Sequence, residues 1–470
     1  MNATPAPAPR DYQLEGIEFL RSRGRALLAD EPGLGKTLQL IRASEGRTLV
    51  VAPAMILDGH VWADEIARWA DDPDRFTCVP YTRLNVRTKT TGSGTRPIGQ
   101  LRPEVDRDWD TIIADESHYI KGRATSWTWA LQELARRAPR VYLATGTPIP
   151  NWGHELFTTL QILFPDRAQR GAELGSYWRW AERWFDCRPN RFSNGAPVVG
   201  DLLACGPECA DRPSTDPCRH YHEFAAASFG DRYLRRLRDT VATDLPPLTE
   251  QRIETPMLPT QKAAYRQMRK EMIAAYESDP AGRQVAVTWS TSARHVVLDR
   301  ISTGLQVAFE DAKPASGKLD RLEYDLSNRS RPTLVFAHYR ASLEAAAQVA
   351  DRLNLHWGLV HGGTSRPDRS RIVRAFQSGE LDVLFGSLET LAEGLTLTQA
   401  DLLIMLEKSW KPSRNTQAIR RVHRLGQTRP VTVLDYVTPN TVDSAKRELL
   451  AAKTDHQVRA LTAADLLRLI

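Results

Sequence analysis

The sequence predicts an α/β protein with two parallel-sheet lobes in tandem and a helical, Cys-containing insertion between them. Short runs of β-branched and aliphatic residues alternate with stretches of helical periodicity, which is the order expected of a parallel sheet. The runs are almost continuously hydrophobic, as in strands that are buried on both faces. They form two sets, separated by a Trp-rich stretch (about 152–255), and 470 residues are enough for two or three domains.

Expected strands occur in both halves of the chain. They cover residues 25–29, 48–52, 111–114 and 141–144, and then 333–336, 356–360, 383–385, 402–406 and 431–436. We expect an amphipathic helix over 260–276 and a last helix over 461–470 that docks on the second lobe. The expected divisions are a disordered lead-in (1–9), a first lobe (10–165), an insertion and connection (166–255, with a possible zinc loop at 187–222) and a second lobe (256–470).

Composition indicates an ordinary intracellular protein. The net charge is +6, the pI is near 9.0 and 41% of the residues are hydrophobic. The sequence has neither an apolar run long enough for a membrane span nor a signal-peptide pattern at its start. We therefore expect a cytoplasmic protein, and the Arg-rich composition suits a bacterium or a bacterial virus. The charge fits nucleic-acid binding and a slight basic excess equally well.

A phosphate-binding loop follows the first expected strand. Residues 30–37 read Asp-Glu-Pro-Gly-Leu-Gly-Lys-Thr and lead into a helical segment. Gly33 and Gly35 would let backbone N–H groups turn toward phosphate oxygens, and the helix would present its positive end. Lys36 would reach the β and γ phosphates of ATP, and the Thr37 hydroxyl would hold magnesium. The strict motif begins with Gly, whereas this sequence has Asp30 at that position. The interpretation as a phosphate loop therefore depends on the strand before it and the helix after it.

A second hydrophobic strand ends in two acids. The run 109–114 (Trp-Asp-Thr-Ile-Ile-Ala) leads into Asp115 and Glu116, at the sheet edge where α/β folds bind ligands. Asp115 would hold magnesium, directly or through water, and Glu116 would polarise the water that attacks the γ phosphate. A solvated acidic pair is the plain alternative, and the upstream phosphate loop favours the catalytic interpretation.

A basic helix is expected near the end of the second half. Spacings of four and seven residues place Gln417, Arg421 and Arg424 on one helix face. A guanidinium offers fixed donors and a permanent charge, so this face suits recognition of a triphosphate. A solvated face, or one that touches DNA phosphates, is the alternative, and it fits Arg420 better.

At these residues the chain resembles the superfamily-two helicases, and within them the Swi/Snf-type DNA-dependent ATPases, close to their annealing-helicase-like branch. The resemblance covers nearly the whole chain. The matching segments are 10–13 (Arg-Asp-Tyr-Gln), 30–37, 49–54, 115–118 (Asp-Glu-Ser-His), 144–151, 333–339, 360–363, 394–397, 410–412 and 417–427. The last of these is the most specific. Asp30 matches the family's own first residue, whereas Ala392-Glu393 departs from its commoner Ala-Gly-Gly.

The resemblance implies two RecA-like lobes that bind ATP and magnesium in a shared cleft. Gln13 would read adenine, and Gly394 lies in a segment that would contact DNA and the nucleotide cleft. Arg421 and Arg424 would approach the phosphates from the second lobe. The implied function is a motor that translocates on duplex or branched DNA and remodels or anneals it, mainly through backbone contacts. Protein partners are not indicated.

Two other classes remain open. A strand-separating DNA or RNA helicase would use the same nucleotide site, and a non-catalytic nucleic-acid-binding module would keep only the fold. The combination of Lys36, Asp115, Glu116, Arg421 and Arg424 argues against the non-catalytic module. The choice between a duplex translocase and a helicase depends on which nucleic acid stimulates ATP hydrolysis.

The cysteines of the insertion suggest a metal site. Cys205, Cys209, Cys218 and His222 have spacings that suit a four-ligand structural zinc site, in a stretch too polar to form its own core. Cys187 competes as a ligand, and reduced thiols in an exposed insertion are the alternative.

Three further features have a structural and a functional interpretation. The Trp178, Trp180 and Trp184 side chains are expected to pack in a core rather than to stack on DNA bases. Residues 235–238 (Arg-Arg-Leu-Arg) resemble the stretch that joins the lobes; they would grip DNA, brake the motor or form a plain solvated helix. Cys78 is expected at a buried strand position.

Overall fold

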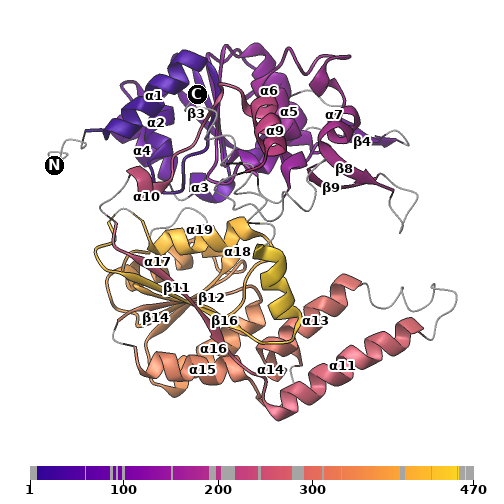
Figure 1. Ribbon diagram of the computed structural model, residues 1–470. Coiled ribbons are helices and arrows are strands. Elements are labelled where there is room, and N and C mark those ends of the chain that lie inside the picture. The colour runs from indigo at the N-terminus through magenta and orange to yellow at the C-terminus, as the bar shows by residue number, and fades with distance from the viewer. Residues whose placement is uncertain are drawn as a thin grey trace. The chain divides into compact units, whose positions relative to one another are not determined.

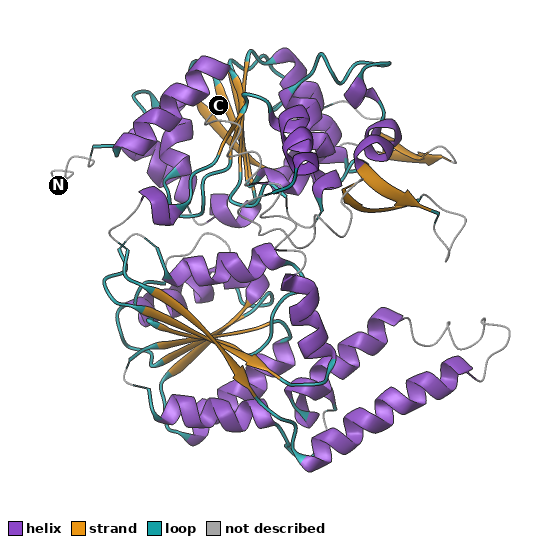
Figure 2. Ribbon diagram, viewed as in Figure 1, coloured by secondary structure: helices purple, strands orange, loops and turns teal. Residues whose placement is uncertain are grey.

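The computed structural model describes most of the chain. The described residues are 8–58, 60–84, 88–91, 94–97, 101–149, 152–189, 197–202, 217–241, 245–277, 291–309, 312–329, 331–391, 397–424, 426–451, 454 and 461. They form two compact units, of which unit 1 comprises Met1–Thr243 with Lys453–Ile470 and unit 2 comprises Asp244–Ala452. Each unit is a parallel sheet with helices on both faces (Figures 1 and 2).

Unit 1 is built on a six-stranded parallel sheet. Its strands, in spatial order, are β10 (Tyr233–Leu234), β1 (Arg25–Leu28), β7 (Arg140–Ala144), β6 (Thr111–Asp115), β2 (Thr48–Ala52) and β3 (Phe76–Pro80). Its helices are α1 (Asp11–Arg23), α2 (Lys36–Ala43), α3 (Ala54–Asp58), α4 (Val61–Trp69), α5 (Ser126–Arg137), α6 (Phe157–Leu163), α7 (Tyr177–Trp184), α9 (Arg219–Phe229) and α10 (Arg238–Val241). The described part of unit 1 also contains short 3-10 helices and two antiparallel strand pairs: β4 (Thr88–Thr91) with β5 (Gly94–Pro97), and β8 (Phe185–Arg188) with β9 (Val198–Leu202).

Alternation along the strands supplies both faces of this sheet, because successive strand side chains point to opposite sides. Ala26, Leu28 and Val50 join a core with α1, α2 and α4. Leu27 and Leu49 join a larger core on the other face, which includes residues of α5, α6, α7 and α9. The strands are therefore buried on both sides, as their continuous hydrophobicity predicts.

Unit 2 repeats this plan with a second six-stranded parallel sheet. In spatial order its strands are β11 (Leu248–Glu254), β16 (Val431–Val437), β15 (Leu402–Met405), β12 (Thr333–Ala337), β14 (Val383–Ser387) and β13 (Trp357–Val360). Its helices are α11 (Pro259–Glu277), α13 (Thr291–Thr303), α14 (Leu305–Ala308), α15 (Gly317–Ser327), α16 (Arg340–Arg352), α17 (Arg366–Gln377), α18 (Leu388–Leu391) and α19 (Pro412–Val422). One core packs α15 and α16 on the sheet, and a second packs α17, α18 and α19 on its opposite face.

The two predicted sheets are confirmed, with strand ends that differ from the expected ones by one or two residues. The part expected as an insertion differs more. Trp180, Phe224 and Tyr233 belong to the same hydrophobic core as the sheet of unit 1, and β10 pairs in parallel with β1. Most of the expected insertion is thus part of the first unit, because its described aromatic residues pack in the core of that unit's sheet.

Two smaller expectations change, and a third is confirmed for one residue. Leu461 packs in the core of unit 1, whereas the sequence favoured docking of the last segment on the second lobe. Cys78 lies in β3 as expected, but it is exposed because β3 is an edge strand. Trp180 is buried, which confirms the core interpretation for that residue.

Candidate nucleotide site

The phosphate loop connects β1 to α2 at the carboxyl edge of the first sheet. Gly33 and Gly35 have φ angles of 92° and 73°, a left-handed conformation that favours glycine. The α2 helix begins at Lys36, so its unpaired N–H groups lie at the loop. The Lys36 ammonium donates to the backbone carbonyls of Asp30 (2.7 Å) and Glu31 (3.3 Å). This is an anion-binding arrangement, in which Thr37 is the second residue of the helix.

Gln13 reaches the same loop from α1. Its Oε1 accepts from the backbone N–H of Arg10 (2.9 Å), and its Nε2 donates to the Leu34 carbonyl (3.2 Å). A Cβ at Gly35 would lie 2.3 Å from Gln13 Nε2, so only glycine fits there without displacing this amide. The structure therefore brings together Gln13 and Leu34, which lie 21 residues apart in the sequence.

The acidic pair lies at the end of β6, and β7 separates that strand from β1. Asp115 is buried, and its carboxylate accepts from Trp62 Nε1 (3.0 Å) and from the backbone N–H of Glu116 (2.9 Å). Burial and the neighbouring Glu116 charge raise the pKa of Asp115 to about 6, although Lys36 and the Trp62 hydrogen bond oppose them. A bound cation would relieve this cost, because it favours the ionised carboxylate.

Glu116 has a different environment from Asp115. Its φ of 49° is uncommon for a residue with a side chain, and such backbone strain concentrates at functional sites. Glu116 Oε2 accepts from Thr145 Oγ1 (3.4 Å) and lies 3.3 Å from His118 Nδ1. Thr145 Oγ1 and His118 Nδ1 are themselves 3.1 Å apart. The end of β7 and the Asp-Glu-Ser-His segment thus form one polar cluster around the Glu116 carboxylate.

A close backbone approach brings this cluster to the phosphate loop. A Cβ at Gly146, which follows Thr145, would lie 2.7 Å from Pro32 Cγ of the loop. A side chain at position 146 would therefore push the loop away from the end of β7. The lysine, the acids and the threonine of the first half consequently occupy one edge of one sheet, as expected for residues that follow neighbouring parallel strands.

In unit 2, α19 carries Gln417 and Arg421. Gln417 is buried, and the Arg421 carbonyl accepts from the backbone N–H of Leu397 (2.9 Å). The prediction that Arg424 shares their helix face is wrong, because α19 ends at Val422. His423 leaves the helical conformation, with φ of −85° and ψ of 84°, and Arg424 lies in the bend that follows.

The remaining predicted site residues are only partly described. Gly394, Cys205 and Cys209 lie outside the described residues. Cys218 is buried at the N-cap of α9, with its Sγ 3.6 Å from His220 Nδ1, and His222 lies on the first turn of that helix. Among the residues that the structure describes, no group of three or more His, Cys, Asp or Glu side chains is arranged to hold a metal ion.

Sequence reasoning missed the residues that support the loop and the acids. Trp62 holds Asp115 from α4, and Arg236 and Arg238 are buried against the phosphate loop. A plain solvated helix, one of the expected alternatives, does not describe these two arginines, because Arg236 precedes α10 and Arg238, its first residue, is buried. Their motif was visible in the sequence, but nothing local indicated which partner they would find.

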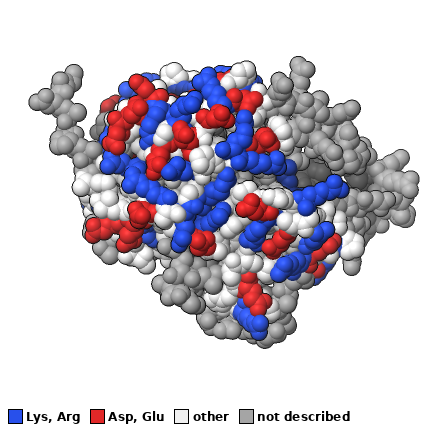
Figure 3. All heavy atoms as spheres, turned by 90° about the horizontal axis from the view of Figure 1, so that it is seen from above, with Lys and Arg blue, Asp and Glu red and all other residues white. Residues whose placement is uncertain are grey.

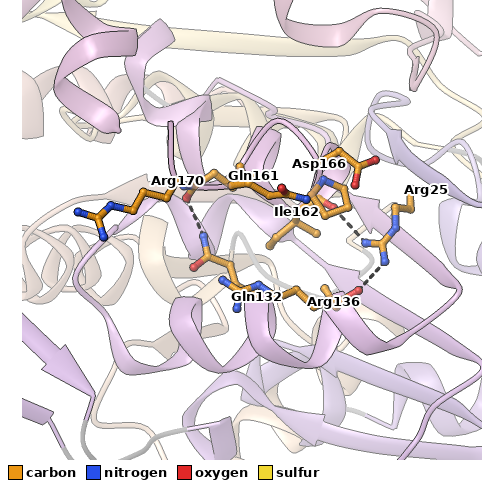
Figure 4. Close-up of a pocket in the computed structure, with 11 residues that line it drawn as sticks. Arg25, Gln132, Arg136, Gln161, Ile162, Asp166 and Arg170 are labelled. Carbon is orange, nitrogen blue, oxygen red and sulfur yellow. Dashed lines mark hydrogen bonds between the residues drawn. The ribbon is translucent and has the colours of Figure 1, made fainter. Parts of the chain in front are cut away.

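A cavity of about 470 Å³ lies at the opposite edge of the first sheet (Figure 4). Arg25, the first residue of β1, lines it and donates to the carbonyls of Ile162 (3.2 Å) and Ala135 (2.6 Å). Gln132 and Gln161 form another of its walls and are hydrogen-bonded to each other (2.9 Å). Because the phosphate loop follows the other end of β1, this cavity is separate from the nucleotide site.

Surface charge is mixed on the face shown in Figure 3, where basic and acidic side chains are interspersed. Several arginines of unit 1 are paired at the surface, including Arg23 with Asp231 (3.1 Å) and Arg137 with Asp106 (2.7 Å). Paired arginines add little net field, so surface charge by itself does not indicate a nucleic-acid partner. In the described part of the chain, no helix has the length and apolar character that crossing a bilayer requires.

Two parallel sheets, the first of which carries a phosphate loop beside an acidic pair, define a class of nucleotide-dependent protein with tandem lobes. The model of the SNF2-related domain matches residues 12–299, and the helicase conserved C-terminal domain matches residues 317–426. The first match alone covers more than half of the chain, so the chain belongs to the SNF2-related family.

The individual relatives share less than 30% of their aligned residues with this chain. The chain is 28% identical over 462 residues to the DNA annealing helicase and endonuclease ZRANB3 of Homo sapiens, covering 94% of this chain and 39% of the relative. It is 26% identical over 450 residues to the SWI/SNF-related matrix-associated actin-dependent regulator of chromatin subfamily A-like protein 1 of Xenopus tropicalis, covering 92% and 43%. The chain therefore spans about two-fifths of the length of these relatives. Both are animal proteins, so the expected bacterial or viral source stays a prediction.

A solved structure, the Sulfolobus solfataricus SWI2/SNF2 ATPase core in complex with dsDNA, is 21% identical, with a TM-score of 0.39. The comparison covers 99% of this chain and 96% of that one.

Proposed function

We propose that this protein is an ATP-hydrolysing motor that translocates on double-stranded or branched DNA and remodels or anneals it. The observation that carries the proposal is the convergence of the phosphate loop, Gln13, Asp115, Glu116 and Thr145 at one sheet edge in a SNF2-related chain. The names of the relatives, an annealing helicase among them, support DNA as the substrate and annealing as one outcome.

The proposed chemistry assigns a role to each group of the first unit. ATP would lie on the loop with its phosphates on the N–H groups at the start of α2, and Lys36 would exchange its loop carbonyls for phosphate oxygens. Magnesium would be held by Thr37 and Asp115, and it would supply charge neutralisation for phosphoryl transfer. Glu116, held by Thr145 and His118, would orient the attacking water. Gln13 would bind the adenine.

The second unit would supply the remaining groups. Arginines that neutralise the transition state typically contribute about 10³–10⁵ in rate, and we assign this role to Arg421 and Arg424. Gln417 and Gly394 would complete the nucleotide contacts. Because Arg424 lies beyond the end of α19, its approach to ATP would depend on the bend after Val422 rather than on a helix face.

A strand-separating DNA or RNA helicase is the second candidate, because it would use the same nucleotide groups. The test is ATP hydrolysis by the purified chain with blunt duplex DNA, single strands, forks and RNA, each at several salt concentrations. We expect stimulation by duplex or forked DNA that falls steeply with salt, since phosphate contacts dominate such binding. Stimulation by RNA alone would contradict the proposal, and salt-insensitive stimulation would contradict the backbone-contact mechanism.

We also propose structural zinc bound by Cys205, Cys209, Cys218 and His222. The support is that Cys218 and His222 lie one helical turn apart at the start of α9. His220, close to the Cys218 thiol, is an alternative ligand. Metal analysis of the protein purified without chelator should give one zinc per chain, and Cys218→Ser should reduce it. A metal-free, fully folded protein would exclude the site.

A further inference from the structure

The segment that leads from β10 toward unit 2 follows the phosphate loop. The backbone N–H of Ala29 donates to the Leu234 carbonyl (2.7 Å), and that of Glu31 donates to the Arg236 carbonyl (3.1 Å). The backbone N–H of Arg238 donates in turn to Glu31 Oε2 (2.9 Å). The segment is thus hydrogen-bonded along the first half of the loop.

Arg236 forms a two-pronged ion pair with the first residue of the loop. Its Nη2 lies 2.6 Å from Asp30 Oδ2, and its Nε lies 3.1 Å from Asp30 Oδ1. The Arg236 backbone N–H donates to the same Oδ1 at 3.0 Å. The Asp30 side chain is 0% exposed and that of Arg236 is 10% exposed, so water screens this pair little.

Further groups around the Arg236–Asp30 pair form hydrogen bonds with the guanidinium or leave space for it. Arg236 Nη2 also donates to Gln39 Oε1 of α2 (2.7 Å), while Gln39 Nε2 donates to Asp30 Oδ2 (3.2 Å). Arg236 Nη1 donates to the Tyr12 carbonyl of α1. A Cβ at Gly16 would lie 2.6 Å from Arg236 Nη2, so the glycine leaves room for the guanidinium.

Asp30 links this pair to the lysine of the loop, since its own carbonyl accepts from Lys36 Nζ at 2.7 Å. An unpaired carboxylate under the loop would repel a triphosphate and would carry a large desolvation cost. A paired one is neutralised, and the fork geometry of the guanidinium fixes the position of the loop backbone.

We propose that Arg236 is a positioning residue for the phosphate loop. Its ion pair with Asp30 holds the loop in the nucleotide-binding conformation, and it makes that conformation depend on the segment that leads to unit 2. A displacement of this segment would move the Asp30 carbonyl and therefore Lys36. The inference rests on the proposed function only in requiring that the loop binds nucleotide.

The test is a double-mutant cycle with Arg236→Gln, Asp30→Asn and both together. Affinity is measured by titration of fluorescent N-methylanthraniloyl-ADP with magnesium, alongside KM and kcat for ATP and the melting temperature. We expect either single substitution to weaken nucleotide affinity and raise KM by roughly 10- to 100-fold, the usual cost of misplacing a binding group by about 1 Å. The double variant should bind nucleotide no more weakly than the weaker-binding single variant, because both substitutions remove the same ion pair.

Two further variants separate positioning from general stability. Arg236→Lys keeps the positive charge but loses the two-pronged geometry of the guanidinium. Its nucleotide affinity should therefore lie between those of the wild type and Arg236→Gln. It also replaces Arg236→Gln in the test if that variant does not fold. Arg232→Gln is the matched control: Arg232 also donates to a carbonyl, that of Leu163, and stacks over Phe164 (4.8 Å). It should lower the melting temperature and leave nucleotide affinity unchanged.

The inference is overturned if Arg236→Gln behaves like Arg232→Gln, with a lower melting temperature and wild-type affinity. Additive losses in the double variant would also overturn it. A folded wild-type protein that binds no nucleotide would instead overturn the proposed function, and this inference with it.

Discussion

At the residue scale, two adjacent carboxylates have different surroundings and so suit different tasks. Asp115 is enclosed, with Trp62 and a backbone N–H on its oxygens and a raised pKa. Glu116 is 19% exposed and is approached by Thr145 and His118. A buried carboxylate with a raised pKa gains most from a cation, whereas a more open one can accept a hydrogen bond from water.

This difference leads to a prediction for Glu116→Gln and Lys36→Ala. Glu116→Gln should retain nucleotide binding and lose roughly 10²–10⁴ in ATP turnover, because the side chain keeps its shape and loses its basicity. Lys36→Ala should lose both binding and turnover, since in the proposed site Lys36 would contact the phosphates in the ground state as well. Steady-state ATPase assays and nucleotide titration measure these effects.

The matched control for this prediction is Glu133→Gln. Glu133 lies on α5 and pairs with Arg136 at the surface (3.1 Å), so its substitution should leave turnover unchanged. Turnover close to the wild-type value in Glu116→Gln would contradict the assignment of the water-orienting residue.

At the element scale, unit 2 is held together by a buried ionic network. Lys318 of α15 pairs with Asp443 (2.8 Å), and Lys446 pairs with Asp299 of α13 (2.5 Å). All four side chains are at most 1% exposed. Lys318 Nζ also donates to the Leu406 carbonyl after β15 (2.7 Å). The network therefore connects α15 to the residue that follows β15 and ties α13 to Lys446.

Removal of one partner should be costly. Lys318→Met would remove one of the cations that pair with Asp443 and leave Arg447 in place, and we expect a loss of about 1.5–3 kcal/mol in the stability of unit 2. Hydrogen exchange of α15 and α16 would measure this loss separately from unit 1. Arg340→Ala, which removes the exposed pair with Glu344, should change stability by less than about 1 kcal/mol. Similar effects of the two substitutions would contradict a structural role for the network.

The same network predicts a pH dependence. Burial alone would raise the pKa of Asp443, but Lys318, Arg447 and Lys446 outweigh it and lower the pKa from 3.8 to about 2. A lowered folded-state pKa contributes stability above the unfolded value, and this contribution is lost as the pH falls from 3.8 through about 2. In Asp443→Asn this part of the acid sensitivity should be absent, as unfolding curves in that pH range would show.

At the scale of the whole molecule, the chain crosses between its two units more than once. Unit 1 holds the beginning of the chain and, through Leu461 in its core, part of the end, while unit 2 is formed by the residues between them. The phosphate loop contacts the segment that precedes unit 2. The proposed nucleotide-binding loop therefore contacts, within unit 1, the segment of the chain that leads to unit 2.

The sequence by itself determined the two sheets and the edge at which the nucleotide groups lie. Strand and helix periods are local, so the burial of the strands on both faces and the placement of Lys36, Asp115 and Glu116 after parallel strands could be predicted. The family follows from the same motifs. Roles for these residues stay predictions until they are tested.

Only the tertiary structure decided which distant groups meet. Asp30 and Arg236 are 206 residues apart, and Trp62 reaches Asp115 across 53 residues, so no local pattern could pair them. The same holds for the aromatic residues that join the expected insertion to the core of unit 1, and for the end of α19 at Val422. Local periodicity states which face of an element is apolar, whereas the partner of a buried charge depends on packing throughout the domain.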